Sequence, residues 1–95
     1  MKTVINTCYG GFSLSEEAYK FLGLEWDGYG FKYRDNRADS KLVECVETLG
    51  NKANGRFASL KVVEIPDNAT DWRKAEYDGT EIITAVVDGK MVDIY

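Results

Sequence analysis

The residues near the N-terminus that are best suited to chemistry are a glycine pair and two serines. Gly10 and Gly11 end a strand-forming run, and Ser13 and Ser15 follow with hydroxyl groups. Glycine lets backbone amides approach a ligand, and the first turn of a helix adds partial positive charge, so a phosphate or carboxylate could bind at such a turn. The stretch matches neither the GxxxxGKS/T phosphate loop nor GxGxxG, and no lysine adjoins it.

An anion at this turn would need a cation from another part of the fold. Arg34 and Arg37 are the candidates, because arginine binds phosphate in a bidentate way and both lie just before a predicted helix. Glycine pairs more often make only a structural corner between a strand and a helix, and this is the interpretation that we favour. The candidate anion site comprises Gly10, Gly11, Ser13, Ser15, Arg34 and Arg37.

The chain contains no histidine, which removes a large class of mechanisms. Ser-His-Asp and Cys-His catalysis and HExxH zinc sites all need an imidazole, and two cysteines cannot build a four-thiolate zinc site. Carboxylate chemistry, lysine or cysteine nucleophiles and carboxylate-bound magnesium stay open, but 16 scattered acids favour none of them. We therefore predict no catalytic residue, no metal site and no cofactor, and an enzyme is the less favoured class.

Length and charge restrict the organisation and the partners. A chain of 95 residues fits one domain, residues 1–95. The net charge is −4 and the basic residues are scattered, which disfavours nucleic acid and anionic membranes as partners. The first residues form no hydrophobic leader for export or membrane insertion. We expect a cytosolic protein in which Cys8 and Cys45 are free thiols.

A second candidate site is the aromatic stretch from Trp26 to Tyr33, where four aromatic residues stand among glycines. Aromatic residues at this density more often cover the core of a small domain. They can also provide a contact surface for a partner, because their large rings supply much of the binding energy at interfaces. The partner-binding residues predicted here are Trp26, Asp27, Tyr29, Phe31 and Tyr33.

Hydrophobic periodicity predicts the elements that would position these residues. A strand covers about residues 2–7, and a first helix begins at Ser13, which has capping-box spacing to Glu16. A second helix begins at residue 39 or 40. The segment Phe57–Ile65 is the clearest strand, and we expect it to lie beside the first one.

Two Asp-Gly pairs, at residues 78–79 and 88–89, predict two-residue hairpin turns and a C-terminal three-strand meander. This register places Thr84 opposite both Arg73 and Asp93. The row is more typical of a solvated ladder than of a binding spot. The other face should join the core, and it carries Trp72, Ile83, Ala85, Val87, Val92 and Ile94.

Together these elements predict an α+β domain. A mainly antiparallel sheet of about five strands would carry two helices on one face, and the C-terminal meander would extend that sheet.

The stretch VINTCYGGFSLS, residues 4–15, resembles a family of short uncharacterised proteins that tailed phages and prophages encode. Three further stretches are similar to this family in the same order, and together the four cover about half of the chain. They are ETLGNKANG at residues 47–55, ASLKVVEIP at residues 58–66 and EYDG at residues 76–79.

The resemblance implies a small accessory protein in the cytosol of an infected bacterium, and it supplies no catalytic residues. By analogy, a protein of this kind would bind and block a host or defence protein without catalysis, as an anti-CRISPR-like inhibitor does. The alternative from the residues themselves is a binder of a small phosphorylated ligand or nucleotide at the Gly10-Gly11 turn.

Overall fold

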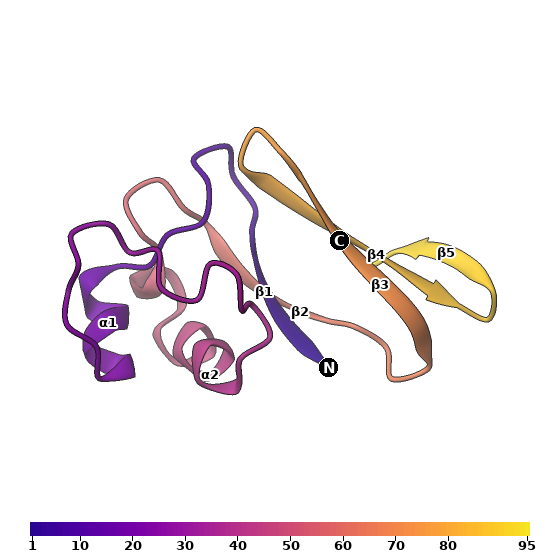
Figure 1. The fold of residues 1–95 in the computed structure, drawn as a ribbon, viewed down its shortest axis with the longest axis horizontal. Coiled ribbons are helices and arrows are strands. Elements are labelled where there is room, and N and C mark those ends of the chain that lie inside the picture. The colour runs from indigo at the N-terminus through magenta and orange to yellow at the C-terminus, as the bar shows by residue number, and fades with distance from the viewer.

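The computed structural model describes residues 1–95, which form an α+β fold (Figure 1). The predicted class, the two helices, the five strands and the C-terminal meander are confirmed. In chain order the elements are β1 (Lys2–Asn6), α1 (Glu16–Leu22), α2 (Ser40–Leu49), the 3-10 helix η1 (Gly50–Ala53), β2 (Leu60–Glu64), β3 (Ala69–Tyr77), β4 (Thr80–Val87) and β5 (Lys90–Asp93).

The five strands form two hydrogen-bonded sheets. β1 pairs antiparallel with β2, as predicted, but the meander β3-β4-β5 is a separate sheet and does not extend the first one. The free edge of β1 is already occupied, because the Val4 amide donates to the Arg37 carbonyl (2.9 Å) and the Asn6 amide donates to Glu81 Oε1 (2.7 Å). No further strand can therefore pair along β1.

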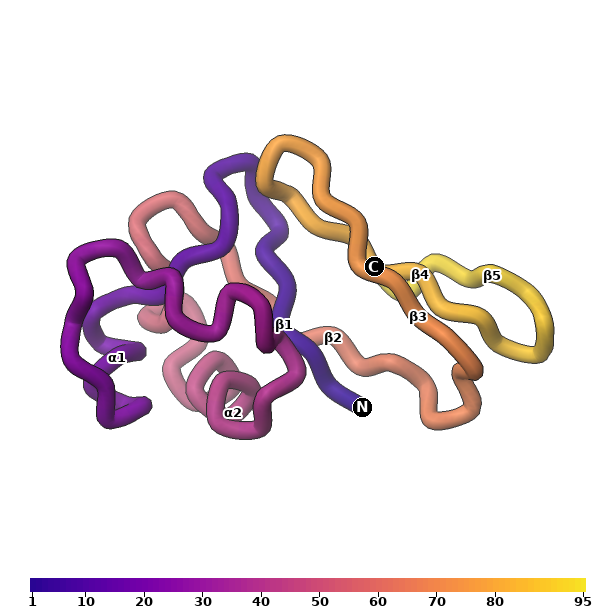
Figure 2. Tube along the Cα trace, in the orientation of Figure 1, coloured from indigo at the N-terminus to yellow at the C-terminus, as the bar shows by residue number.

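Side-chain alternation gives the β1-β2 ribbon two apolar faces, so the fold has three layers. One face, with Val4, packs against the helices around Tyr19 and Leu42. The opposite face, with Ile5 and Val63, packs against the meander; that second cluster contains Ile5, Val63, Ile65, Ile83 and Ala85. Figure 1 and the trace in Figure 2 show the helices on one side of β1-β2 and the meander on the other.

Helix α1 begins later than predicted. Its N-cap is Ser15, whose hydroxyl accepts the Ala18 amide (3.1 Å), so the predicted Ser13–Glu16 capping box is wrong. Residues 12–15 are held extended because backbone bonds anchor them on both sides. These bonds run from Leu14 N to Gly30 O (2.8 Å), from Gly55 N to Ser13 O (2.9 Å) and from Ser15 N to Ala53 O (3.0 Å).

The other two elements of the first half follow the prediction more closely. Asp39 caps α2, and its Oδ1 accepts the Lys41 amide at 2.8 Å. The strand predicted over Phe57–Ile65 is shorter in the structure, because Phe57 is exposed and its carbonyl accepts a hydrogen bond from the Cys8 thiol.

The predicted register of the meander is confirmed. Thr84 lies opposite Arg73 on β3 and opposite Asp93 on β5. Both Asp-Gly turns have positive φ at their two residues, as a type I′ turn requires. Ile83 and Ala85 are buried as expected, but Val92 is 37% exposed, so its assignment to the core is wrong. Val92 lies on the edge strand β5, and only β4 of the meander contacts β1.

A buried ionic cluster joins the layers, and we call it the Glu81 cluster: Glu81, Arg37, Lys74 and Asn6. The Arg37 guanidinium binds the Glu81 carboxylate in a bidentate way, with Nη1 2.6 Å from Oε1 and Nη2 2.8 Å from Oε2. Lys74 Nζ lies 3.1 Å from Oε2, and the Asn6 amide donates to Oε1. The Arg37 and Glu81 side chains are 7% and 1% exposed, so this ion pair is almost fully shielded from solvent.

Asn6 adds a second connection between β1 and the meander. Its side-chain amide donates to Gly79 O and to Cys8 O, both at 2.7 Å, and its Oδ1 accepts the Ser59 amide at 2.8 Å. The fully buried side chain thereby fixes the Asp78-Gly79 turn against the end of β1.

The environment of Glu81 favours its charged form. Burial alone would raise the pKa of this carboxyl, but the hydrogen bond from Arg37, the Asn6 amide and the Lys74 ammonium outweigh burial and hold the pKa below its ordinary value of 4.5. The folded protein therefore keeps Glu81 ionised.

Two further properties of the chain bear on the expectations above. Both cysteines are free thiols, and burial raises the pKa of Cys45 to about 11. None of the helices has the length and apolar character that a membrane crossing requires.

Replacing Glu81 by Gln should lower the free energy of unfolding by about 3–5 kcal/mol, because it leaves the Arg37 guanidinium buried without a counter-ion. Urea titration followed by circular dichroism measures this change. The matched control is Glu47→Gln, which breaks the exposed Lys2–Glu47 pair (2.8 Å) and should leave the midpoint nearly unchanged. Equal effects of the two substitutions would contradict this assignment.

The stability difference between wild type and Glu81→Gln should depend on pH. The pKa of Glu81 is lowered by folding, so the unfolded chain binds more protons as the pH falls below 4.5, and the stability from the cluster is lost in that range. The difference between wild type and Glu81→Gln should therefore be full at neutral pH and should narrow below pH 4.5.

Candidate functional site

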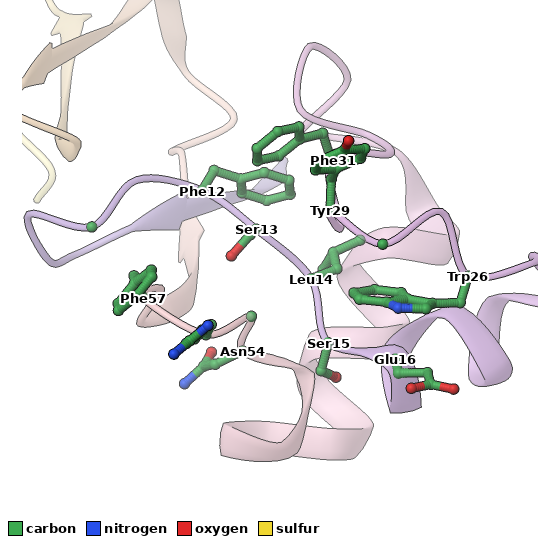
Figure 3. A pocket seen from close by; sticks show the side chains of 14 residues that line it. Phe12, Ser13, Leu14, Ser15, Glu16, Trp26, Tyr29, Phe31, Asn54 and Phe57 are labelled. Atoms are coloured by element: carbon green, nitrogen blue, oxygen red, sulfur yellow. The ribbon is translucent and has the colours of Figure 1, made fainter.

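The protein has two main surface hollows of nearly equal size, and one of them is a groove with a cavity volume of about 490 Å³ (Figure 3). Its floor is the extended segment around Leu14. On one side of this floor stand Trp26, Tyr29 and Phe31, and on the other stands Phe57 (Figure 3). We call this hollow the aromatic groove.

Two glycines let the neighbouring loops close on the floor. A Cβ atom at Gly30 would overlap the Leu14 carbonyl oxygen, and one at Gly55 would overlap the Ser13 hydroxyl. Because these positions accept only glycine, the backbones on both sides come within hydrogen-bonding distance of residues 13 and 14. The shape of the groove therefore depends on backbone contacts as well as on side chains.

Helix α1 positions the aromatic loop, which comprises residues 26–33, through Tyr19. The buried Tyr19 hydroxyl donates to Asp27 Oδ2 (2.8 Å) and accepts the Lys32 amide (2.9 Å). Asp27 Oδ1 in turn accepts the amides of Tyr29 and Gly30, both at 2.8 Å. These bonds fix the loop at both of its ends and in its middle.

The ionisation states of the Asp27 carboxyl and the Tyr19 hydroxyl suit these hydrogen bonds. The amides of Gly30 and Tyr29, together with the Tyr19 hydroxyl, hold the pKa of Asp27 below its ordinary value. Burial is the main cause that raises the pKa of Tyr19, so this hydroxyl keeps its proton and remains a donor. The rings add a contact, since Trp26 meets Tyr19 edge-to-face with 5.0 Å between centroids.

The structure brings together three of the five residues predicted for partner binding. Trp26, Tyr29 and Phe31 are 41%, 71% and 49% exposed and line the groove, with the rings of Tyr29 and Phe31 stacked at 6.0 Å. Asp27 does not line the groove, because its carboxylate is directed at Tyr19 and the loop amides. Tyr33 packs half-buried against the helical core.

The residues predicted for anion binding are divided between two hollows. Gly10, Gly11, Arg34 and Arg37 line a second hollow of about 480 Å³ next to the groove. Ser13 and Ser15 line the aromatic groove instead, and Ser15 serves as the N-cap of α1. Helix α1 starts at Glu16, so its N-terminus does not adjoin the glycine pair.

The second hollow carries balanced charge. Its lining contains three basic side chains and three acidic ones, namely Arg34, Arg37, Lys74, Asp35, Glu76 and Glu81. Arg37 and Lys74 are both bound to Glu81. Arg34 alone among the three cations has no carboxylate partner, and its guanidinium lies 5.5 Å from the centre of the Phe31 ring.

Several groove residues were not found from the sequence. The sequence pattern places Leu14 in a helix, because its pairing depends on Gly30, far along the chain. It places Phe57 in a strand, whereas the Phe57 carbonyl accepts a hydrogen bond from the Cys8 thiol. The buried position of Glu81 could have been recognised from the sequence, since the predicted register puts it on the same face as Ile83, which is buried. An acid at a position that faces the core indicates a buried partner.

The fold and the groove define a small α+β protein with an aromatic surface groove. No group of three or more His, Cys, Asp or Glu side chains is arranged to hold a metal ion. No protein-family model matches the chain, and no curated protein or solved structure matches it either.

Replacing Asp27 by Ala should loosen the aromatic loop without unfolding the domain, because three donors lose their acceptor. Hydrogen exchange followed by NMR should show faster exchange at the amides of Tyr29 and Gly30. The matched control is Glu25→Ala, which removes a neighbouring acid that makes no hydrogen bond. Unchanged protection in Asp27→Ala would show that the loop is held by other contacts.

Proposed function

We propose that this protein is a non-catalytic binding protein that captures a protein of the bacterial host, or of its defence systems, in the aromatic groove. The observation that carries the proposal is the grouping of three exposed aromatic side chains around one hollow, on a loop that internal hydrogen bonds hold in place. Trp and Tyr are the residues that most often dominate binding energy at protein interfaces.

The rigidity of the aromatic loop matters because the binding energy of its rings is comparable to the entropic cost of association. Burying half of three aromatic side chains would contribute roughly 7 kcal/mol, which is comparable to the entropic cost of association. A loop that had to order on binding would lose much of that energy. The Tyr19–Asp27 bond and the loop amides meet this cost during folding, so the rings are available for binding.

The charges near the groove favour a partner segment with an apolar anchor and a basic residue. Glu16 lines the same groove as Trp26 (Figure 3), and the chain has a net charge of −4. The exposed faces of Trp26 and Tyr29 can also accept a Lys or Arg side chain by cation–π contact. At the other end Arg56 already lies over the Phe57 ring, at 5.2 Å from its centre.

The setting of the proposal comes from the sequence. The resemblance of residues 4–15 to phage-encoded proteins supports a role in the cytosol of an infected bacterium, and the lack of histidine supports binding without catalysis. An anti-CRISPR-like inhibitor is the form of this function that we propose by analogy.

The second candidate is a binder of a small phosphorylated ligand or nucleotide. One observation favours it: Gly10 and Gly11 share a hollow with Arg34 and Arg37. The balanced charge of that hollow and the engagement of Arg37 by Glu81 both oppose binding of an anion, so we place this function second.

Affinity capture from a lysate of the bacterial host tests the first candidate. The double variant Trp26→Ala/Tyr29→Ala should weaken binding of the enriched partner by about 100-fold or more, because two central aromatic anchors are removed. The matched control is Tyr9→Ala/Phe21→Ala, which removes two exposed rings outside the groove and should bind as wild type does.

Two results would count against the groove. One is capture of no partner, and the other is equal binding by both double variants. Native mass spectrometry of the purified protein distinguishes the second candidate, since a nucleotide that is retained by wild type and lost in Arg34→Ala would favour ligand binding.

A further inference from the structure

The outer face of the meander is covered by no other element of the chain. Its inner face packs on β1-β2 through Ile83 and Ala85 of β4, and Trp72 of β3 packs against the same cluster. In Figures 1 and 2 the meander forms the end of the molecule opposite the helices. The uncovered face carries Tyr77, Ile82 and Met91, which are 74%, 49% and 69% exposed, and the half-buried Val86 lies opposite Met91. Exposed apolar side chains on an uncovered sheet face commonly mark an interface.

A charged row crosses the middle of this face. Arg73 on one edge strand and Asp93 on the other flank Thr84 on the central strand. Two strand spacings separate them by about 10 Å, so they do not pair within one chain. The one ion pair of Arg73 is an exposed contact with Asp71 at 4.0 Å, and Asp93 has none.

This arrangement is complementary to itself. A half-turn about an axis parallel to β4 lays the β4 strands of two copies over each other and lays β3 of each copy over β5 of the other. Rows keep their register under this rotation, so Arg73 of each copy meets Asp93 of the other. Thr84, Ile82 and Val86 then meet their own counterparts. Such an isologous contact closes at two copies.

We propose that the protein forms a two-fold symmetric dimer in which the outer faces of two meanders pack against each other. Aligned sheets pack face to face about 10 Å apart at an angle near 30°, which keeps the central row in contact. The charge pattern selects a second copy as the occupant, because a uniformly basic or acidic partner would leave either Arg73 or Asp93 opposed by a like charge. No meander residue lines the aromatic groove, so both grooves stay open in the dimer.

Sedimentation velocity over a series of concentrations tests the dimer. The charge reversals Arg73→Asp and Asp93→Arg should each weaken self-association by about 10-fold or more, because both symmetric contacts become repulsive. A 1:1 mixture of these two variants should associate again, since each repulsive surface is the complement of the other. The double variant Arg73→Asp/Asp93→Arg should dimerise like wild type.

Three outcomes would overturn the proposal. They are a wild-type chain that stays monomeric up to about 1 mM, reversals that leave a dimer intact, and a mixture that fails to restore association. Circular dichroism melts establish that each variant is folded, which the exposure of both side chains favours. A dimer that dissociates in Trp26→Ala/Tyr29→Ala but not in the reversals would place the contact at the groove and equally refute the meander interface.

Discussion

The buried carboxylate of Glu81 is the point at which three separate parts of the chain meet. Arg37 comes from the loop before α2, Asn6 from the end of β1 and Lys74 from β3. A buried charge is costly unless every lone pair is matched, so the cluster is stable only when all these segments are in place. Because the two sheets share no backbone ladder, the cluster, the side-chain amide of Asn6 and the apolar contacts around Ile5 are what hold the meander to the rest of the fold.

The aromatic groove depends on the Glu81 cluster indirectly, through Arg37. The Arg37 guanidinium lies over the Phe12 ring at 3.9 Å, and Phe12 begins the extended segment that forms the groove floor. The Arg37 Nε also donates to the Arg34 carbonyl (2.7 Å), which fixes the loop that follows the aromatic residues. The Tyr19–Asp27 bond holds the aromatic stretch itself to α1. The groove is therefore supported by the hydrogen bonds of Arg37 and Tyr19 as well as by the backbone bonds of residues 13–15.

The features that could be predicted from the sequence are those that neighbouring residues determine. The Asp-Gly turns specify the meander register locally, and Asp39 specifies the start of α2. The start of α1 could not be predicted, because distant glycines hold residues 12–15 extended. Aromatic density located Trp26, Tyr29 and Phe31, whereas Phe57 reaches the groove only through the fold. The anion-site residues were separated for the same reason, since two serines that follow a glycine pair in sequence face a different hollow in space.

Native-state hydrogen exchange of the wild-type protein tests most directly whether the Glu81 cluster makes the layers one cooperative unit. The central amides of the β1-β2 and β3-β4 ladders should then exchange through the same opening, with one free energy and one denaturant dependence that match global unfolding. The account would be contradicted if the β3-β4 amides exchanged through a much smaller opening while the β1-β2 amides stayed protected, because the meander would then open independently of the helical layer.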